Sequence, residues 1–196
     1  MSLVNPFILG IVTKVYDDII DIKLNVPENF IAVLQSLIIL FFTLTAYNDF
    51  YFSFACSVVA LLNSGFDNPF WKSLIPVAII LTIINFSCAG NNFILKIILA
   101  LGAIAGILTI AVFEDRLFPE EVSIEKIVFR TLLFFGFIGA TIFLKLKILP
   151  LPNFSFSSLA KTTTLMASNM LVSVSMMSYL LFFSGKTLKE LNGLKP

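Results

Sequence analysis

Residues 93–113 of the chain read FILKIILALGAIAGILTIAVF, and Lys96 is their one charged residue. A helix of about 20 apolar residues spans the hydrocarbon core of a bilayer. Strands of a soluble core are usually much shorter than this run. The stretch therefore predicts a membrane-spanning helix.

The remainder of the chain repeats this pattern. Of its 196 residues 58% are hydrophobic and 13% are charged, whereas soluble domains carry about 25% charged residues. Mean hydropathy is +0.99. Five further apolar runs predict spans at 30–46, 50–62, 74–88, 127–149 and 159–183.

The spans should be helices, because backbone that faces lipid must satisfy its hydrogen bonds within the segment. A membrane barrel would need alternating apolar and polar residues, and the runs lack this alternation. The connections are too short for a soluble domain. We therefore predict an all-α fold, a polytopic transmembrane bundle of six to seven helices, with residues 1–196 as a single domain.

Composition also excludes several functions. The net charge is +1, without a basic run of the kind that binds nucleic acid. The chain has no histidine, which removes histidine-based triads and most zinc chemistry. Cys56 and Cys88 lie in apolar runs, where we expect them to pack as small hydrophobic residues.

The distribution of basic residues predicts an orientation. Alternate threading of seven segments puts Lys23, Lys72, Arg116, Lys126, Arg130, Lys186, Lys189 and Lys195 on one side, and Lys96, Lys145, Lys147 and Lys161 on the other. The side richer in lysine and arginine is usually cytoplasmic. We expect the acidic loops and the C-terminus to be cytoplasmic.

The seventh segment, 6–24, carries most of the charge that lies inside an apolar run. Asp17, Asp18 and Asp21 occur there, followed by Asn25. On a helix these residues share a face, because their spacings are three, four or seven. Clustered carboxylates suit Mg²⁺, which in proteins also bridges to phosphates. The alternative is a solvated helix end just outside the bilayer.

The stretch Asp17-Asp18-x2-Asp21-x3-Asn25 resembles the first aspartate-rich motif of UbiA-type intramembrane prenyltransferases. Asp17 stands where that family commonly has Asn, and Asn25 stands at its last Asp. The soluble polyprenyl diphosphate synthases have a similar motif, but their water-soluble fold does not suit this chain. The resemblance implies an enzyme that uses Mg²⁺ and an isoprenoid diphosphate.

In the same family a second acidic motif lies four helices later. Here Glu121 and Glu125 follow four segments later, with i, i+4 spacing. The resemblance implies metal ligation by Asp17, Asp18, Asp21, Asn25, Glu121 and Glu125. We expect Lys14, Lys23, Arg116 and Lys126 to bind the anionic substrate. Acidic residues at the start of a helix are also favoured by the helix dipole, which is the alternative reading of Glu121 and Glu125.

Other features suggest packing. Gly102 and Gly106 have the small-x3-small spacing that most often marks contact between helices inside a membrane protein, and Gly136 and Gly139 resemble them. The last segment is rich in Ser and Thr and also contains Lys161 and Asn169, so we expect it to face protein or a cavity. Lys14 can pair with Asp17 or Asp18 one turn on.

The leading hypothesis is therefore a lipid-modifying, Mg²⁺-dependent, prenyltransferase-like enzyme whose partners are membrane lipids and an isoprenoid diphosphate. A multi-pass transporter or channel, with the acidic helix beside a cation path, is the second hypothesis. A non-catalytic membrane scaffold is the third.

Overall fold

The computed structural model describes residues 3–21, 26–63, 69–88, 93–118, 122–146 and 156–182. These residues form seven α-helices and one short 3-10 turn, with no strand among them, so the all-α prediction is confirmed. The elements are α1 (Val4–Asp21), α2 (Glu28–Ala46), α3 (Phe50–Asn63), α4 (Pro69–Ile84), η1 (Asn85–Cys88), α5 (Phe93–Leu117), α6 (Ile124–Lys145) and α7 (Phe156–Phe182).

Local sequence explains two of the helix starts. Ser123 caps α6, because its side chain accepts a hydrogen bond from the backbone N–H of Lys126 at 3.1 Å. Asp49 does the same for α3, where its Oδ1 accepts from the N–H of Phe52 at 3.1 Å. Asn48, just before Asp49, has a φ of 54°, a left-handed conformation that Asn tolerates better than most residues. This turn joins α2 to α3.

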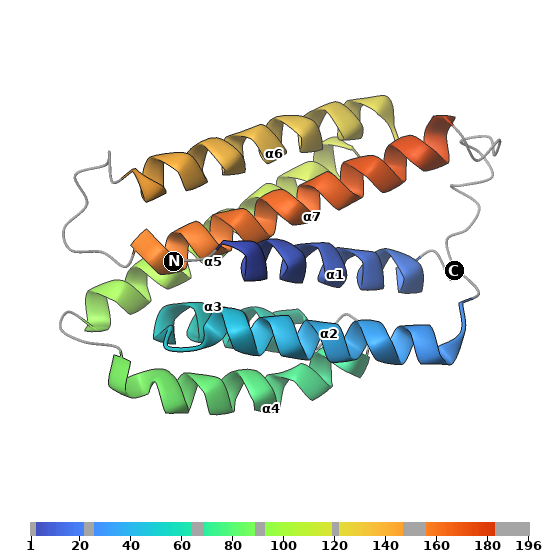
Figure 1. Ribbon diagram of the computed structural model, residues 1–196. Coiled ribbons are helices and arrows are strands. Elements are labelled where there is room, and N and C mark those ends of the chain that lie inside the picture. Colours follow the sequence, from blue (N-terminus) through green and yellow to red (C-terminus); the bar gives the residue numbers. More distant parts are fainter. Residues whose placement is uncertain are drawn as a thin grey trace.

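The helices run in alternating directions (Figure 1). As a result α1, α5 and α7 end on the side where α2, α4 and α6 begin, and we name this side the Asp18 end of the bundle. The shorter α3 points the same way but stops about midway along the bundle. The opposite end, where the α2–α3 turn lies, is the Asp49 end. The alternation thus brings the end of α1, the end of α5 and the start of α6 to the same end of the bundle.

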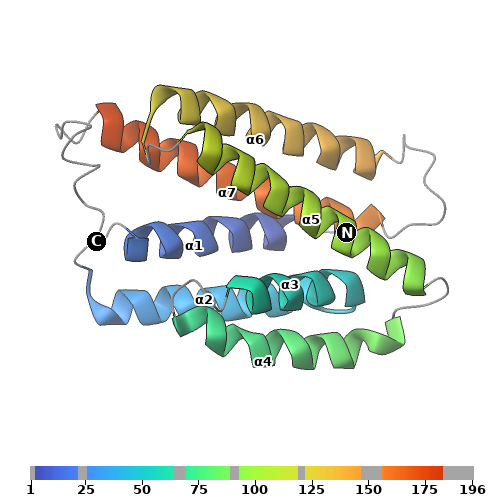
Figure 2. The ribbon, with the colours of Figure 1, turned by 180° about the vertical axis from the view of Figure 1, so that it is seen from behind.

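The helices form an elongated bundle with α7 near its middle. α7 packs along α6 on one side and α1 on the other, α1 also packs on α2, and α3 packs on α4. α5 lies on the outside and crosses in front of α7 when the bundle is seen from behind (Figure 2).

The largest core cluster fills the space between α1, α2 and α4. On α1 it contains Leu9, Val12, Tyr16 and Ile19, which form one stripe because their spacings match the helical repeat. The Tyr16 ring lies 5.0 Å from the ring of Phe70 on α4. This stripe explains why α1 stays inside the bundle despite its charges.

Several boundaries differ from the predicted segments. α4 begins at Pro69, so Trp71 and Lys72 belong to a helix and not to the connection where the sequence placed them. α5 continues through Leu117, so Glu114 and its two neighbours form its last turn. In both cases polar and aromatic residues extend a helix beyond its apolar run, which hydropathy alone underestimates.

The four glycines singled out for packing have open space where a side chain would begin. A Cβ added at Gly102, Gly106, Gly136 or Gly139 would meet nothing within 4 Å. The predicted internal packing through Gly102 and Gly106 is therefore wrong: these residues lie on the outer face of α5. The close approach occurs instead at Gly10, against Leu165 and Ser168 of α7.

Candidate functional site

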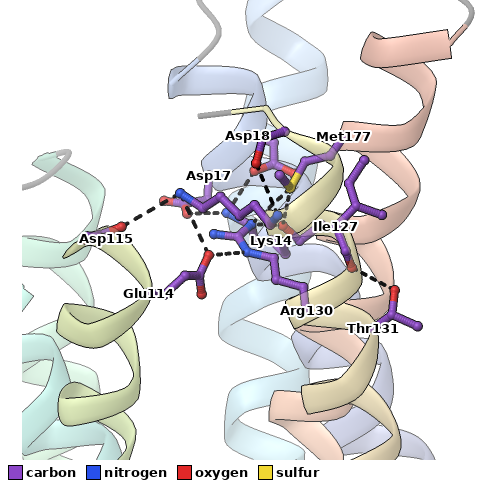
Figure 3. Close-up of polar contacts among 12 residues, drawn as sticks. Lys14, Asp17, Asp18, Glu114, Asp115, Ile127, Arg130, Thr131 and Met177 are labelled. Carbon is purple, nitrogen blue, oxygen red and sulfur yellow. Dashed lines mark hydrogen bonds and ion pairs between the residues drawn. The ribbon is translucent and has the colours of Figure 1, made fainter. Parts of the chain in front are cut away.

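The acidic part of α1 forms a charged cluster around Lys14. Lys14 Nζ lies 3.1 Å from Asp17 Oδ2 and 2.8 Å from Asp18 Oδ1 (Figure 3). The predicted pairing of Lys14 one turn on is confirmed. Because both bonds lie within one helix, they neutralise part of the acidic charge without help from another element.

One oxygen of Asp18 has no partner among the residues that the structure describes. Asp18 is 9% exposed, and its Oδ2 is a buried atom without a hydrogen bond to any of those residues. Burying a carboxylate oxygen without a hydrogen bond costs free energy, and folded proteins seldom leave such an atom without a partner. A cation or a ligand hydrogen-bond donor would satisfy it.

Next to this cluster lies a partly enclosed cavity of about 400 Å³. This volume is in the range of small-molecule sites, which are mostly apolar and contain a few polar groups. The polar lining comes from Thr13, Lys14 and Asp17 of α1 and from Thr162 and Asn169 of α7. Apolar side chains of α2, α3 and α5 line most of the remainder. The cavity therefore has a polar wall and an apolar interior.

Asn169 connects the polar residues that α1 and α7 contribute to the cavity. Its Oδ1 accepts a hydrogen bond from Thr13 Oγ1 at 3.3 Å, so α1 and α7 contact one another beside the cavity. The prediction that the last segment faces protein or a cavity is confirmed, since Ser168 and Ser173 are buried and Asn169 lines the cavity.

A second charged cluster joins α5, α6 and α7. Arg130 Nε donates to Glu114 Oε1 at 2.6 Å, and its Nη1 donates to Ser173 Oγ (Figure 3). Lys126 Nζ is farther away, 3.7 Å from Glu114 Oε1 and 3.8 Å from Asp115 Oδ1. Glu114 and Lys126 are both buried. Two cations therefore surround one buried carboxylate.

The two clusters share one side of α7. Asn169 contacts the helix of Lys14, and Ser173 contacts Arg130. The two α7 residues are four apart and lie on the same helical face. α7 thus connects the acidic helix with the α5–α6 cluster near the Asp18 end.

A third cluster, at the Asp49 end, was not predicted. Lys161 Nζ donates to Asp49 Oδ2 at 2.8 Å and to the backbone oxygen of Thr45 at 2.7 Å. Ser158 Oγ donates to Asp49 Oδ1 at 2.5 Å. Asp49 was assigned to a short connection and Lys161 was left as an unexplained charge, because nothing in the sequence links residues 112 positions apart.

Several predicted site residues do not join these clusters. Arg116 is exposed in the last turn of α5, and Glu125 is exposed in the first turn of α6. Asp21 is the last residue of α1, but its side chain lies outside the described part of the structure, as do Lys23, Asn25 and Glu121. The predicted joint site of both acidic motifs thus remains a prediction.

The predicted Mg²⁺ site can be checked only in part on the described residues. Asp18 Oδ2 is free to ligate, and Asp17 lies beside the cavity, but Lys14 contacts the other oxygen of Asp18 and one oxygen of Asp17. Within the described ranges no three Asp, Glu, His or Cys side chains come together around a point where a metal could bind. A complete site would need Asp21 or Asn25 as well.

Comparison with protein-family models, with curated proteins and with solved structures finds no match to this chain. The function has to be inferred from the site itself.

Proposed function

We propose that the chain is a multi-pass membrane protein in which all seven helices cross or enter the bilayer. Among the described residues three helical segments are long and apolar enough to span it: Glu28–Ala46, Ile124–Lys145 and Ser157–Phe182. Large apolar side chains project outward from α2, α4, α5 and α6, including Ile83 at 68% exposure and Leu132 at 65%. Lipid is the solvent that suits such a surface.

Labelling of single cysteines tests the predicted membrane topology. In a protein without Cys56 and Cys88, cysteines at positions 25, 68 and 120 are expected to react with a membrane-impermeant thiol reagent from one side. Cysteines at positions 48 and 92 are expected to react from the other side. Reaction of positions 25 and 120 from opposite sides would contradict both the topology and a joint acidic site, because about 30 Å of hydrocarbon would separate them.

The proposed activity is that of a Mg²⁺-dependent prenyltransferase-like enzyme acting on an isoprenoid diphosphate or a related lipid. The observation that carries the proposal is the cavity: an apolar interior suits a prenyl chain, and a charged wall at Lys14 and Asp17 suits its headgroup. The free oxygen of Asp18 is adjacent in sequence to this wall.

Each group has a role that follows from its contacts. Lys14 holds Asp17 and Asp18 in place, and it can turn to an anionic headgroup once a ligand competes for it. Asp18, with Asp21 and Asn25, would hold Mg²⁺, which when bound supplies positive charge that neutralises a leaving diphosphate. The apolar side chains around the cavity exclude water from a reactive prenyl carbon.

Asp18→Asn tests the enzyme. In vesicles of total membrane lipid the protein is expected to release diphosphate from farnesyl diphosphate when Mg²⁺ is present. Asp18→Asn should lower that rate at least about 100-fold, because the charge that holds the metal is lost. Asp17 remains to pair with Lys14, which favours a folded variant. Thermal unfolding measured with and without Mg²⁺ should show stabilisation in the unmodified protein but not in Asp18→Asn.

Asp115→Asn is the matched control, because Asp115 has the same charge and its side chain is 78% exposed. It should keep the full rate. Equal rates in Asp18→Asn and the unmodified protein would refute the enzyme. The ion pairs made by α1 and α7, at Lys14 and at Lys161, favour a transporter as the second candidate. Cation flux that is lost in Asp18→Asn, without diphosphate release by the unmodified protein, would identify that function.

A further inference from the structure

α5 forms a wall of the cavity that is one helix thick. Ile104, Ile107, Leu108 and Ala111 line the cavity, and their spacing places them on one helical face. The opposite face is exposed: Phe113 is 54% exposed, and nothing lies within 4 Å of a Cβ placed at Gly102 or Gly106. Val112, on the flank between the two faces, is also 54% exposed.

Contacts at its two ends hold α5 against the bundle. At its start, the Phe93 ring lies 5.5 Å from Phe50 and 5.4 Å from Phe86. At its end, Glu114 accepts the short hydrogen bond from Arg130 and lies near Lys126. Between these ends α5 packs mainly on α3, and its outer face has no helix over it in the described structure.

The bilayer changes the relative strength of these contacts. Lipid tails are as apolar as the side chains of α3, so replacing helix contacts by lipid costs α5 little. Separating Glu114 from Arg130 costs much more, because it leaves the carboxylate without its cation and leaves Arg130 with only neutral partners, such as Ser173, in a medium of low dielectric constant. Among the contacts at the two ends of α5, the ion pair of Glu114 is therefore the costliest to break in a bilayer.

We propose that α5 is a movable wall of the cavity, that the Glu114–Arg130 pair is its latch, and that a ligand with an apolar chain enters the cavity sideways from the hydrocarbon of the bilayer. The polar wall at Lys14 and Asn169 lies on α1 and α7, which do not move with α5, so a headgroup site stays formed while the chain enters. The inference rests on the proposed membrane location but not on Mg²⁺ or prenyl transfer.

Cys56 provides a native reporter of cavity access. It lies on α3 and lines the cavity, and Cys88→Ser leaves it as the single cysteine of the chain. In phosphatidylcholine vesicles Glu114→Gln is expected to raise the rate at which N-ethylmaleimide modifies Cys56 about tenfold, because glutamine keeps an acceptor oxygen but lacks the negative charge that pairs with Arg130 and Lys126. Glu28→Gln, the same change at an exposed residue in the first turn of α2, should leave that rate unchanged.

Spin labels distinguish movement of α5 from general loosening. In a protein without native cysteines, labels at Val112 on α5 and Ile80 on α4 measure the position of the wall, since both residues are exposed. Labels at Ile80 and Leu132 form a reference pair that leaves α5 out. Glu114→Gln should broaden the first distance distribution or shift it to longer values, and the reference pair should keep its distribution.

The latch would be refuted by a Glu114→Gln protein in which both the Cys56 rate and the Val112–Ile80 distances equal those of the unmodified protein. It would also be refuted if Glu28→Gln raised the rate as much, or if the reference pair broadened equally. None of these measurements needs a substrate, so a failed latch and a failed enzyme assay are separate outcomes.

Discussion

Gly10→Ala is expected to destabilise the protein by about 3 kcal/mol, at the upper end of what overpacking costs. An added Cβ would lie 2.5 Å from the backbone oxygen of Leu165 and would overlap the hydroxyl of Ser168. The hydroxyl can rotate away, but the carbonyl belongs to the backbone of α7. The substitution therefore pushes α1 away from α7 and weakens the contact between Thr13 and Asn169.

Gly102→Ala provides the matched control, since the same methyl group would enter open space on the surface of α5. It should be neutral or stabilise the protein by about 0.5–1 kcal/mol, because alanine favours a helix more than glycine does. Thermal unfolding in detergent micelles, followed by circular dichroism, measures both variants. Adding Ser168→Ala to Gly10→Ala should restore little stability, because the Leu165 carbonyl remains. Equal unfolding temperatures for Gly10→Ala and Gly102→Ala would contradict this account of the α1–α7 contact.

Lys161→Met should cost about 3–5 kcal/mol, because it leaves the buried Asp49 carboxylate without its cation. Asp49→Asn should also destabilise, since Lys161 would keep neutral partners such as the Thr45 carbonyl and the ring of Phe52, whose centroid lies 6.0 Å away, but would lose the counter-charge that Asp49 supplies. The double variant should cost clearly less than the sum of the two single variants, because neither charge is then left alone. The unfolding free energies of the four proteins give this coupling directly.

Lys145→Met serves as the control for loss of a lysine near the same end of the bundle. Lys145 is exposed in the last turn of α6, so its replacement should change stability by less than about 0.5 kcal/mol. Strictly additive effects of Asp49→Asn and Lys161→Met would mean that the ion pair contributes nothing beyond its separate partners.

The sequence predicted every helix, because runs of apolar residues longer than a strand leave few other structures available in lipid. It also predicted the local pairing of Lys14, since residues three and four apart on a helix are neighbours. In both cases the deciding information lies within one turn or one segment.

Contacts between helices were harder to predict. When a helix is apolar on all sides, its hydrophobic pattern does not show which side faces protein. For this reason Gly102 was assigned to packing between helices, and the close contact at Gly10 was not predicted. The partners of Asp49 and Glu114 lie on other helices, at Lys161 and Arg130. An isolated charge in a membrane is costly, so each of these charges is expected to have a partner. A single sequence does not show which residue that partner is.

The contact between α1 and α7 also sets an order of events during synthesis. The Thr13–Asn169 hydrogen bond joins residues 156 positions apart, and ribosomes add roughly 5–20 residues per second. α1 therefore waits about 10–30 s for its partner. During that delay the pairs of Lys14 with Asp17 and Asp18 can already form, because they need only α1 itself. The Asp49–Lys161 pair cannot, so Asp49 must remain near water or headgroups until α7 is inserted.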